Sequence, residues 1–109
     1  RMSRGLGDVY KRQEYINSLP EAEKIDGYTV LQHMEKGEFD KILFKRWEKK
    51  VYEVYFQKNN RVFYITVDKE NIYLLHSCRK QKNKTEKKDA NIVRKRAKEL
   101  GNMLGRKFI

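Results

Sequence analysis

Residues 51–78 decide the fold, and they read VYEVYFQKNNRVFYITVDKENIYLLHSC. Three runs in this stretch, 51–57, 61–67 and 71–78, are rich in β-branched and aromatic residues, as strands are. Asn59-Asn60 tolerates the positive φ that a tight hairpin turn requires, and a second turn is expected at Lys69-Glu70. The stretch therefore predicts three antiparallel strands.

Two-residue turns would also fix which side chains share a face of this sheet. Phe56 would then lie opposite Phe63, and Val54 opposite Ile65. In the next pair of strands, Phe63 would lie opposite His76 and Arg61 opposite Cys78. This mostly apolar face is expected to form the core, and it carries Tyr52, Val54, Phe56, Phe63, Ile65, Val67, Ile72, Leu74 and His76. The other face is polar and rich in tyrosine, with Glu53, Tyr55, Gln57, Tyr64, Thr66, Tyr73 and Ser77. We expect that second face to be open to water or to a ligand.

Two helices are expected before the strands. Residues 14–19 suggest one helical turn, and Pro20 can open a longer helix because its missing N–H is not needed there. Gly37 suits the end of that helix. Its apolar residues recur at helical spacing, at Ala22, Ile25, Tyr28, Leu31 and Met34. Residues 38–50 are expected to connect this helix to the sheet, with Leu43, Phe44 and Trp47 as buried anchors.

A last helix is expected after the strands, with Thr85 as its N-cap. Glu86 and Asp89 in its first turn suit the positive end of the helix dipole. Its apolar stripe comprises Ala90, Val93, Ala97, Leu100 and Leu104. The predicted class is α+β: two N-terminal helices, a three-stranded antiparallel sheet covered on one face, and a C-terminal helix.

The first 13 residues look foreign to this domain. Residues 8–13 read DVYKRQ, which matches one reading frame of the transposon end used in sequencing libraries. We expect residues 1–13 to be translated adapter, residues 14–109 to be one domain, and a native opening strand to be missing. The alternative is a genuine basic arm.

Composition limits the function classes. The chain has 109 residues, 39% of them hydrophobic and 12% aromatic, which suits one small folded domain rather than a disordered chain. Cys78 is the single cysteine, so no internal disulfide or cysteine-based metal site is expected, and a reducing cytoplasm fits. No apolar run is long enough for a membrane span. We expect no metal and no cofactor.

The net charge of +11 is concentrated near the C-terminus. Residues 79–98 contain ten Lys/Arg and two acids, a balance of +8, whereas residues 14–78 contain ten Lys/Arg and eleven acids. Positive charge concentrated in one part of the chain favours a polyanionic partner, most commonly nucleic acid. A solvated helix face is the alternative.

Several motifs in this order resemble a known family. They are Leu19-Pro20-Glu21, Tyr52-Glu53, residues 61–64 (RVFY), and Leu74-Leu75-His76 before a lysine-rich segment that ends at Lys84-Thr85. Residues 14–100 thereby resemble the phage-derived branch of the RelE/HigB toxins of type II toxin–antitoxin systems. The sequence departs from that pattern at Ser77-Cys78, where Gly-Phe is usual, at Thr85-Glu86, where Thr-Pro is usual, and at Tyr55, where an arginine is frequent.

The resemblance implies a RelE-like fold and a cytoplasmic bacterial toxin. Such a toxin is an mRNA interferase, a metal-independent endoribonuclease that cuts mRNA on the ribosome, inhibits translation and is held inactive by a cognate antitoxin protein. Some relatives, the ParE-like toxins, act on DNA gyrase instead. A non-catalytic basic module that binds nucleic acid is a third hypothesis.

Metal-free RNA cutting needs a proton acceptor, a proton donor and positive charge near the phosphate. The candidate catalytic residues are Arg61, His76, Lys80, Lys82 and Lys84. His76 titrates near neutral pH when unperturbed, although a histidine at this position is more often packed than catalytic. Clustered lysines lower one another's pKa. No acidic residue is expected in this cluster, which argues against a metal nuclease.

Further residues are candidates for holding RNA. Tyr55, Tyr64 and Tyr73 could stack on bases, or could form an ordinary cross-strand aromatic cluster. The candidate phosphate-binding residues are Lys49, Lys50, Arg79, Lys87 and Lys88. Charge at a strand start or on a helix is the alternative for these cations. We expect Arg61→Ala and Lys82→Ala to abolish toxicity without unfolding the domain.

Overall fold

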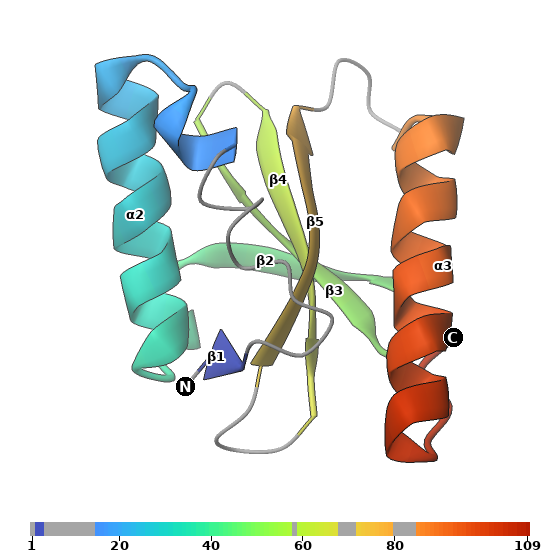
Figure 1. Cartoon of the computed structure of the whole chain (residues 1–109). Helices are drawn as coiled ribbons and strands as arrows, with labels where there is room; N and C mark the ends of the chain where they lie inside the picture. The colour runs from blue at the N-terminus through green and yellow to red at the C-terminus, as the bar shows by residue number, and fades with distance from the viewer. Residues whose placement is uncertain (1, 4–14, 58, 68–71, 80–84) are drawn as a thin grey trace.

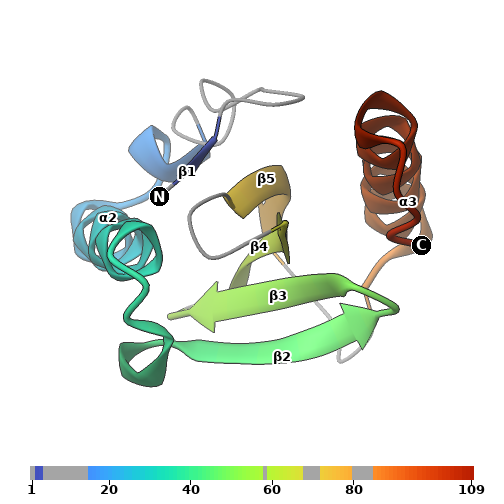
Figure 2. The ribbon, with the colours of Figure 1, turned by 90° about the horizontal axis from the view of Figure 1, so that it is seen from below.

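A mixed sheet lies between two helices in the computed structural model, which describes residues 2–3, 15–57, 59–67, 72–79 and 85–109. Helix α2 (Glu21–Glu35) covers one face and helix α3 (Lys87–Leu104) covers the other (Figure 1). The view from below shows the same three layers, with the curved sheet between the helices (Figure 2). The predicted α+β class is confirmed, but helices cover both faces rather than one.

The sheet has five strands in the order β1-β5-β4-β3-β2. They are β1 (Met2–Ser3), β2 (Leu43–Glu48), β3 (Val51–Phe56), β4 (Asn60–Thr66) and β5 (Ile72–Arg79). Strands β2 to β5 are antiparallel, and β1 pairs in parallel with β5. The three predicted strands are confirmed as β3, β4 and β5. Strand β1 lies in the segment expected to be adapter, and the origin of that segment stays a prediction.

The fourth antiparallel strand, β2, lies where a connection was predicted. It follows a short 3₁₀ helix η1 (Phe39–Lys41) and joins β3 through a turn in which Lys49 has φ 51°. Leu43 and Phe44 are 62% and 42% exposed, so they are not buried anchors, whereas Trp47 packs edge-on against Phe63. The strand was missed because its leucine, lysine and arginine residues favour helix at least as much as strand.

The predicted β3–β4 register is wrong by three residues. Val54 pairs with Val62, and Phe56 with Asn60, because Asn60 already belongs to β4 and Asn59 alone takes positive φ (61°). An odd shift moves every β4 side chain to the other face relative to β3. The predicted β4–β5 pairs Phe63–His76 and Arg61–Cys78 are confirmed. A register shift after Phe63 changes the pairs beyond them.

Each face of the sheet carries its own core. The core under α2 contains Ile16, Val30, Leu31, Met34, Val54, Phe56, Val62, Tyr64, Ile72 and Leu74. The core under α3 contains Val51, Phe63, Ile65, Leu75, Val93, Ala97, Leu100 and Phe108. The predicted open face is therefore wrong: Tyr64 is 2% exposed and Glu53 is fully buried.

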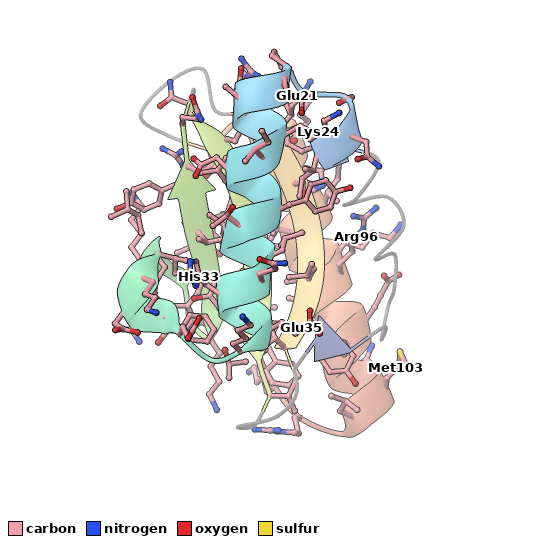
Figure 3. The ribbon with its side chains drawn as sticks, turned by 90° about the vertical axis from the view of Figure 1, so that its left-hand side faces the viewer. Glu21, Lys24, His33, Glu35, Arg96 and Met103 are labelled. Carbon is pink, nitrogen blue, oxygen red and sulfur yellow. The ribbon has the colours of Figure 1, made fainter. Side chains whose placement is uncertain are left out.

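Helix α2 begins after Pro20 as predicted, and Gly37 follows its end with φ 75°. Its buried face is rotated from the predicted stripe, because Ile25 is 59% exposed. The buried positions are Glu23, Gly27, Val30, Leu31 and Met34. Figure 3 shows α2 from its outer side, with Glu21 and Lys24 toward its start and His33 and Glu35 toward its end.

Helix α3 buries most of its predicted stripe: Ala90, Val93, Ala97 and Leu100. Leu104 is 38% exposed, because the chain turns away from the helix at Gly105. The predicted cap is wrong, since the N-cap is Glu86 and the buried Thr85 hydroxyl makes no hydrogen bond with a described residue. No helix in the described ranges has both the length and the apolar character to cross a bilayer.

Candidate nucleic-acid site

The candidate site lies on the α3 face of the sheet, beside the start of α3. Cross-strand partners in an antiparallel sheet share a face, so the pairs Tyr55–Arg61, Arg61–Cys78 and Phe63–His76 bring these side chains to one side. Asp89 reaches the same place from the first turn of α3. The site therefore combines three predicted residues, Tyr55, Arg61 and His76, with acids that were not predicted.

Arg61 is held by three contacts. Its Nε atom lies 3.2 Å from Glu53 Oε1, and its guanidinium carbon lies 4.8 Å from the centre of the Tyr55 ring. Its Nη1 atom donates a 3.1 Å hydrogen bond to the Asn60 carbonyl. With its side chain 14% exposed, Arg61 presents a fixed, planar cation of the kind that suits phosphate recognition.

His76 forms the second part of the site. Its Nε2 atom lies 2.8 Å from Asp89 Oδ1, and its ring stacks on Phe63 with 6.4 Å between centroids. The side chains of His76 and Asp89 are 15% and 10% exposed. A carboxylate in this position fixes the orientation of the imidazole ring. The expectation of an acid-free cluster is wrong, because Glu53 and Asp89 both lie in it.

Arg79 faces away from Arg61. It pairs with Asn60 in the ladder and so lies on the α2 face, where its Nη2 atom is 2.5 Å from Glu23 Oε1. The same Glu23 oxygen accepts a 2.9 Å hydrogen bond from Asn60 Nδ2, and the Tyr15 hydroxyl donates to Asn60 Oδ1. Burial raises the pKa of the Tyr15 hydroxyl, against the opposing effect of Arg79. Arg79 thus anchors the end of β5 and does not join Arg61 in one cluster.

Both arginines among the candidate residues are therefore paired with an acid. Arg61 contacts Glu53 and Arg79 contacts Glu23, both buried acids. Lys80, Lys82 and Lys84 lie outside the described residues, and their roles stay predictions. Lys87 and Lys88 are exposed at the start of α3.

Lys49 and Lys50 lie apart from this site. They form the β2–β3 turn, and the Lys50 N–H donates a 3.2 Å hydrogen bond to the Phe108 carbonyl beyond the end of α3. A hollow of about 420 Å³ opens there, lined by Arg46, Lys49, Lys50, Lys107, Phe108 and Ile109. These lysines lie at the opposite end of α3 from His76, so the structure does not bring them to the candidate site.

The three tyrosines do not share one open face. Tyr55 is half-buried under Arg61, and Tyr73 packs at the edge of the α3-side core. Tyr64 lies on the α2 face, stacked between Phe39 and Tyr52 with 5.9 Å to each ring centroid. Of these three tyrosines, Tyr55 is the one that lies against Arg61. The aromatic-cluster alternative is the better description of Tyr64.

A family comparison covers this whole site. The family model of phage-derived Gp49-like proteins (DUF891) matches residues 14–98. The chain belongs to the phage-derived Gp49-like family. This family is known for RelE-like toxins. The match agrees with the sequence resemblance to phage-derived toxins, and it does not distinguish the HigB branch. No curated protein matches the chain.

Within this Gp49-like domain, sequence reasoning missed three charged residues near the site. Lys45 pairs with Glu53 in the ladder, so the exposed Lys45 lies on the same face as Arg61. It was missed because its strand was read as a connection. Glu53 and Asp89 were missed because the first was placed on an open face and the second was assigned only to the helix dipole.

The burial of Tyr64 leads to a pH prediction for the Gp49-like domain. Burial, reinforced by Tyr52, raises the pKa of the Tyr64 hydroxyl well above its usual range. The stability that this neutral hydroxyl contributes is present below pH ~10 and is lost as the pH rises from there toward the folded-state pKa. Between pH 8 and pH 11, the wild-type protein should lose about 1 kcal/mol more free energy of unfolding than Tyr64→Phe.

Urea unfolding at both pH values measures this difference. Lysine side chains also titrate in this pH range, but their effect on stability is common to both proteins and cancels. Parallel losses in the two proteins would mean that Tyr64 ionises as freely in the folded state as in the unfolded one.

Proposed function

We propose that this Gp49-like protein is the toxin of a type II toxin–antitoxin system, in the HigB-like branch, and that it cuts mRNA on the ribosome. One observation carries the proposal: Arg61, stacked on Tyr55, shares a sheet face with the His76–Asp89 pair. A fixed cation and an oriented imidazole are two of the groups that metal-free RNA cutting requires. Family membership supports the toxin class.

The proposed chemistry begins at the 2′-OH, which attacks the neighbouring phosphorus while the bond to the 5′ oxygen breaks. A base takes the proton from the 2′-OH and an acid protonates the departing oxygen. We assign His76, oriented by Asp89, to one of these proton transfers. Arg61 stabilises the charge that develops on the phosphate oxygens. Lys80, Lys82 and Lys84 are proposed to supply the remaining proton transfer and positive charge.

RNA positioning is assigned to the surroundings of this pair. Tyr55 offers an aromatic ring beside the cation, and base stacking on such a ring contributes about 1–3 kcal/mol. Lys45, Lys87 and Lys88 are exposed around the site and suit phosphate contacts. Binding should therefore weaken as salt rises, because each neutralised phosphate releases counterions.

The proposed partners are mRNA on the ribosome, in the cytoplasm, and a cognate antitoxin. Strand β2 forms one edge of the sheet, and its Lys45 and Arg46 are exposed there. An extended antitoxin segment with acidic side chains could add to such an edge through main-chain hydrogen bonds. Charge complementarity would then bring the segment beside Tyr55, which is paired with Leu43 of β2.

The test is induction of the chain in bacteria with mapping of transcript ends. We expect growth arrest and mRNA cuts in phase with codons. Lys82→Ala and Lys45→Ala should each reduce cutting at least about tenfold if these lysines contact the reacting phosphate or its neighbours. Lys36→Ala, an exposed lysine at the end of α2, is the matched control and should cut normally.

Two outcomes would contradict the proposal. Intact mRNA with blocked replication would point to a gyrase-directed toxin. Normal growth and intact mRNA, with the folded protein present, would leave a basic nucleic-acid-binding module.

A further inference from the structure

We propose that His76, Cys78 and Asp89 form a binding site for Zn²⁺ or a similar borderline divalent ion. A chain with a single cysteine is not expected to hold a cysteine-based metal site. The fold nevertheless brings together residues that are separated in the sequence. One ligand atom from each of these three side chains lies within 4.8 Å of the other two. An imidazole, a thiol and a carboxylate are each established zinc ligand types.

The two elements that carry these ligands are firmly placed. His76 and Cys78 are two residues apart on β5, so their side chains lie on the same face of the strand. Asp89 lies in the first turn of α3, which packs on that face through Val93 and Ala97. The existing 2.8 Å contact between His76 Nε2 and Asp89 Oδ1 already holds the strand and helix ligands together.

The spacing of the ligand atoms is close to what a tetrahedral ion requires. Zinc bonds of about 2.3 Å to sulfur and 2.0–2.2 Å to nitrogen or oxygen place tetrahedral ligand atoms about 3.4–3.6 Å apart. The His76–Asp89 contact would open by about 0.6 Å and the wider separations would close, which side-chain rotation can provide.

The charges of the site also suit a divalent ion of this class. A Cys78 thiolate and the Asp89 carboxylate together balance two positive charges, while a neutral His76 adds none. Arg61 lies opposite Cys78 in the ladder, but it is paired with Glu53. A thiolate and an imidazole favour Zn²⁺ or Co²⁺ over Mg²⁺ and Ca²⁺, which prefer oxygen ligands.

Solvent can reach the site, because the side chains of His76 and Asp89 are 15% and 10% exposed and Cys78 is half-buried. Three protein ligands leave a fourth position for water, as in zinc sites that react with other molecules. This inference concerns metal binding alone, and it goes beyond the proposed function. The metal-bound form and the RNA-cutting form would be alternatives, because His76 and Asp89 cannot hold the ion and carry out the proposed proton transfer at the same time.

Cobalt titration of the purified, reduced full chain tests the site, because Co²⁺ occupies zinc sites and reports on its ligands by absorbance. We expect a thiolate-to-cobalt charge-transfer band and the visible bands of a four-coordinate ion, saturating at one equivalent. Zn²⁺ should then abolish both. Absence of the charge-transfer band at stoichiometric Co²⁺ would overturn the proposal.

Variants identify the ligands. Cys78→Ser should remove the charge-transfer band, and Asp89→Asn should weaken Co²⁺ and Zn²⁺ binding at least about tenfold, with circular dichroism to verify folding. The matched control is His33→Gln, because His33 is the other histidine and contacts Glu38 on the α2 side of the molecule. A wild-type spectrum from Cys78→Ser, or lost binding in His33→Gln, would also overturn the assignment.

Discussion

Replacing Arg61 with alanine should lower the free energy of unfolding by about 3–5 kcal/mol, because it removes a cation from beside a buried carboxylate. Glu53 is fully buried, and its Oε1 atom lies 3.2 Å from Arg61 Nε. The alanine would leave that negative charge in a low-dielectric environment without its arginine. Urea unfolding followed by circular dichroism measures the loss.

A double-variant cycle separates this effect from the loss of packing. Adding Glu53→Gln to Arg61→Ala should restore at least half of the lost stability, since no buried charge then remains without the arginine. A wild-type unfolding midpoint for Arg61→Ala would show that Glu53 does not depend on this pair. The prediction also revises an expectation from the sequence, that Arg61→Ala would abolish toxicity without unfolding the protein. Lys82→Ala and Lys45→Ala are therefore cleaner tests of activity.

Gly101→Ala should have the second-largest effect, with a loss of about 2–3 kcal/mol from overpacking against the backbone. A Cβ atom at Gly101 would meet the Arg106 carbonyl oxygen at 2.4 Å, where no flexible side chain can yield. The Arg106 N–H also donates a 2.9 Å hydrogen bond to the Gly101 carbonyl. The clash would lift the C-terminal segment and expose Phe108, which is 2% exposed in the α3-side core.

Gly105→Ala is the matched control, four residues along the same chain segment. Gly105 has φ 65°, and a Cβ atom there would meet nothing within 4 Å. It should cost about 1–2 kcal/mol, from the left-handed backbone conformation alone. Thermal unfolding measures the loss of stability in each variant. Hydrogen exchange at the amides next to Phe108 shows whether the C-terminal segment has lifted. Equal losses with an undisturbed C-terminal segment in both would contradict the close approach at Gly101.

The central strands and the last helix could be predicted because their signals are local. Alternating apolar residues mark β3, β4 and β5, and a stripe at helical spacing marks α3. The β3–β4 register could not be predicted in this way, because it depends on whether Asn60 ends the turn or begins the strand. Strand β2 has no such local signal, and it forms because its backbone completes the ladder of β3.

The candidate site was only partly predictable for a related reason. Arg61 and His76 were found because arginine and histidine suggest phosphate chemistry by type alone. Their partners are Glu53, 8 residues before Arg61, and Asp89, 13 residues after His76. Which side of the sheet these two acids face depends on how their strand and helix pack, and local sequence does not give that. Charge counts predicted a positive region, but they could not show that buried acids pair with Arg61 and Arg79.

The exposed edge at β2 also bears on solubility. An outer strand with unpaired backbone groups and exposed Leu43 and Phe44 is a template for self-association. Here Lys41, Lys45 and Arg46 are exposed along the same segment. Two copies that met edge to edge would bring these like charges together, and the repulsion opposes the growth of aggregates. The positive charge of this edge therefore opposes self-association of the protein through β2.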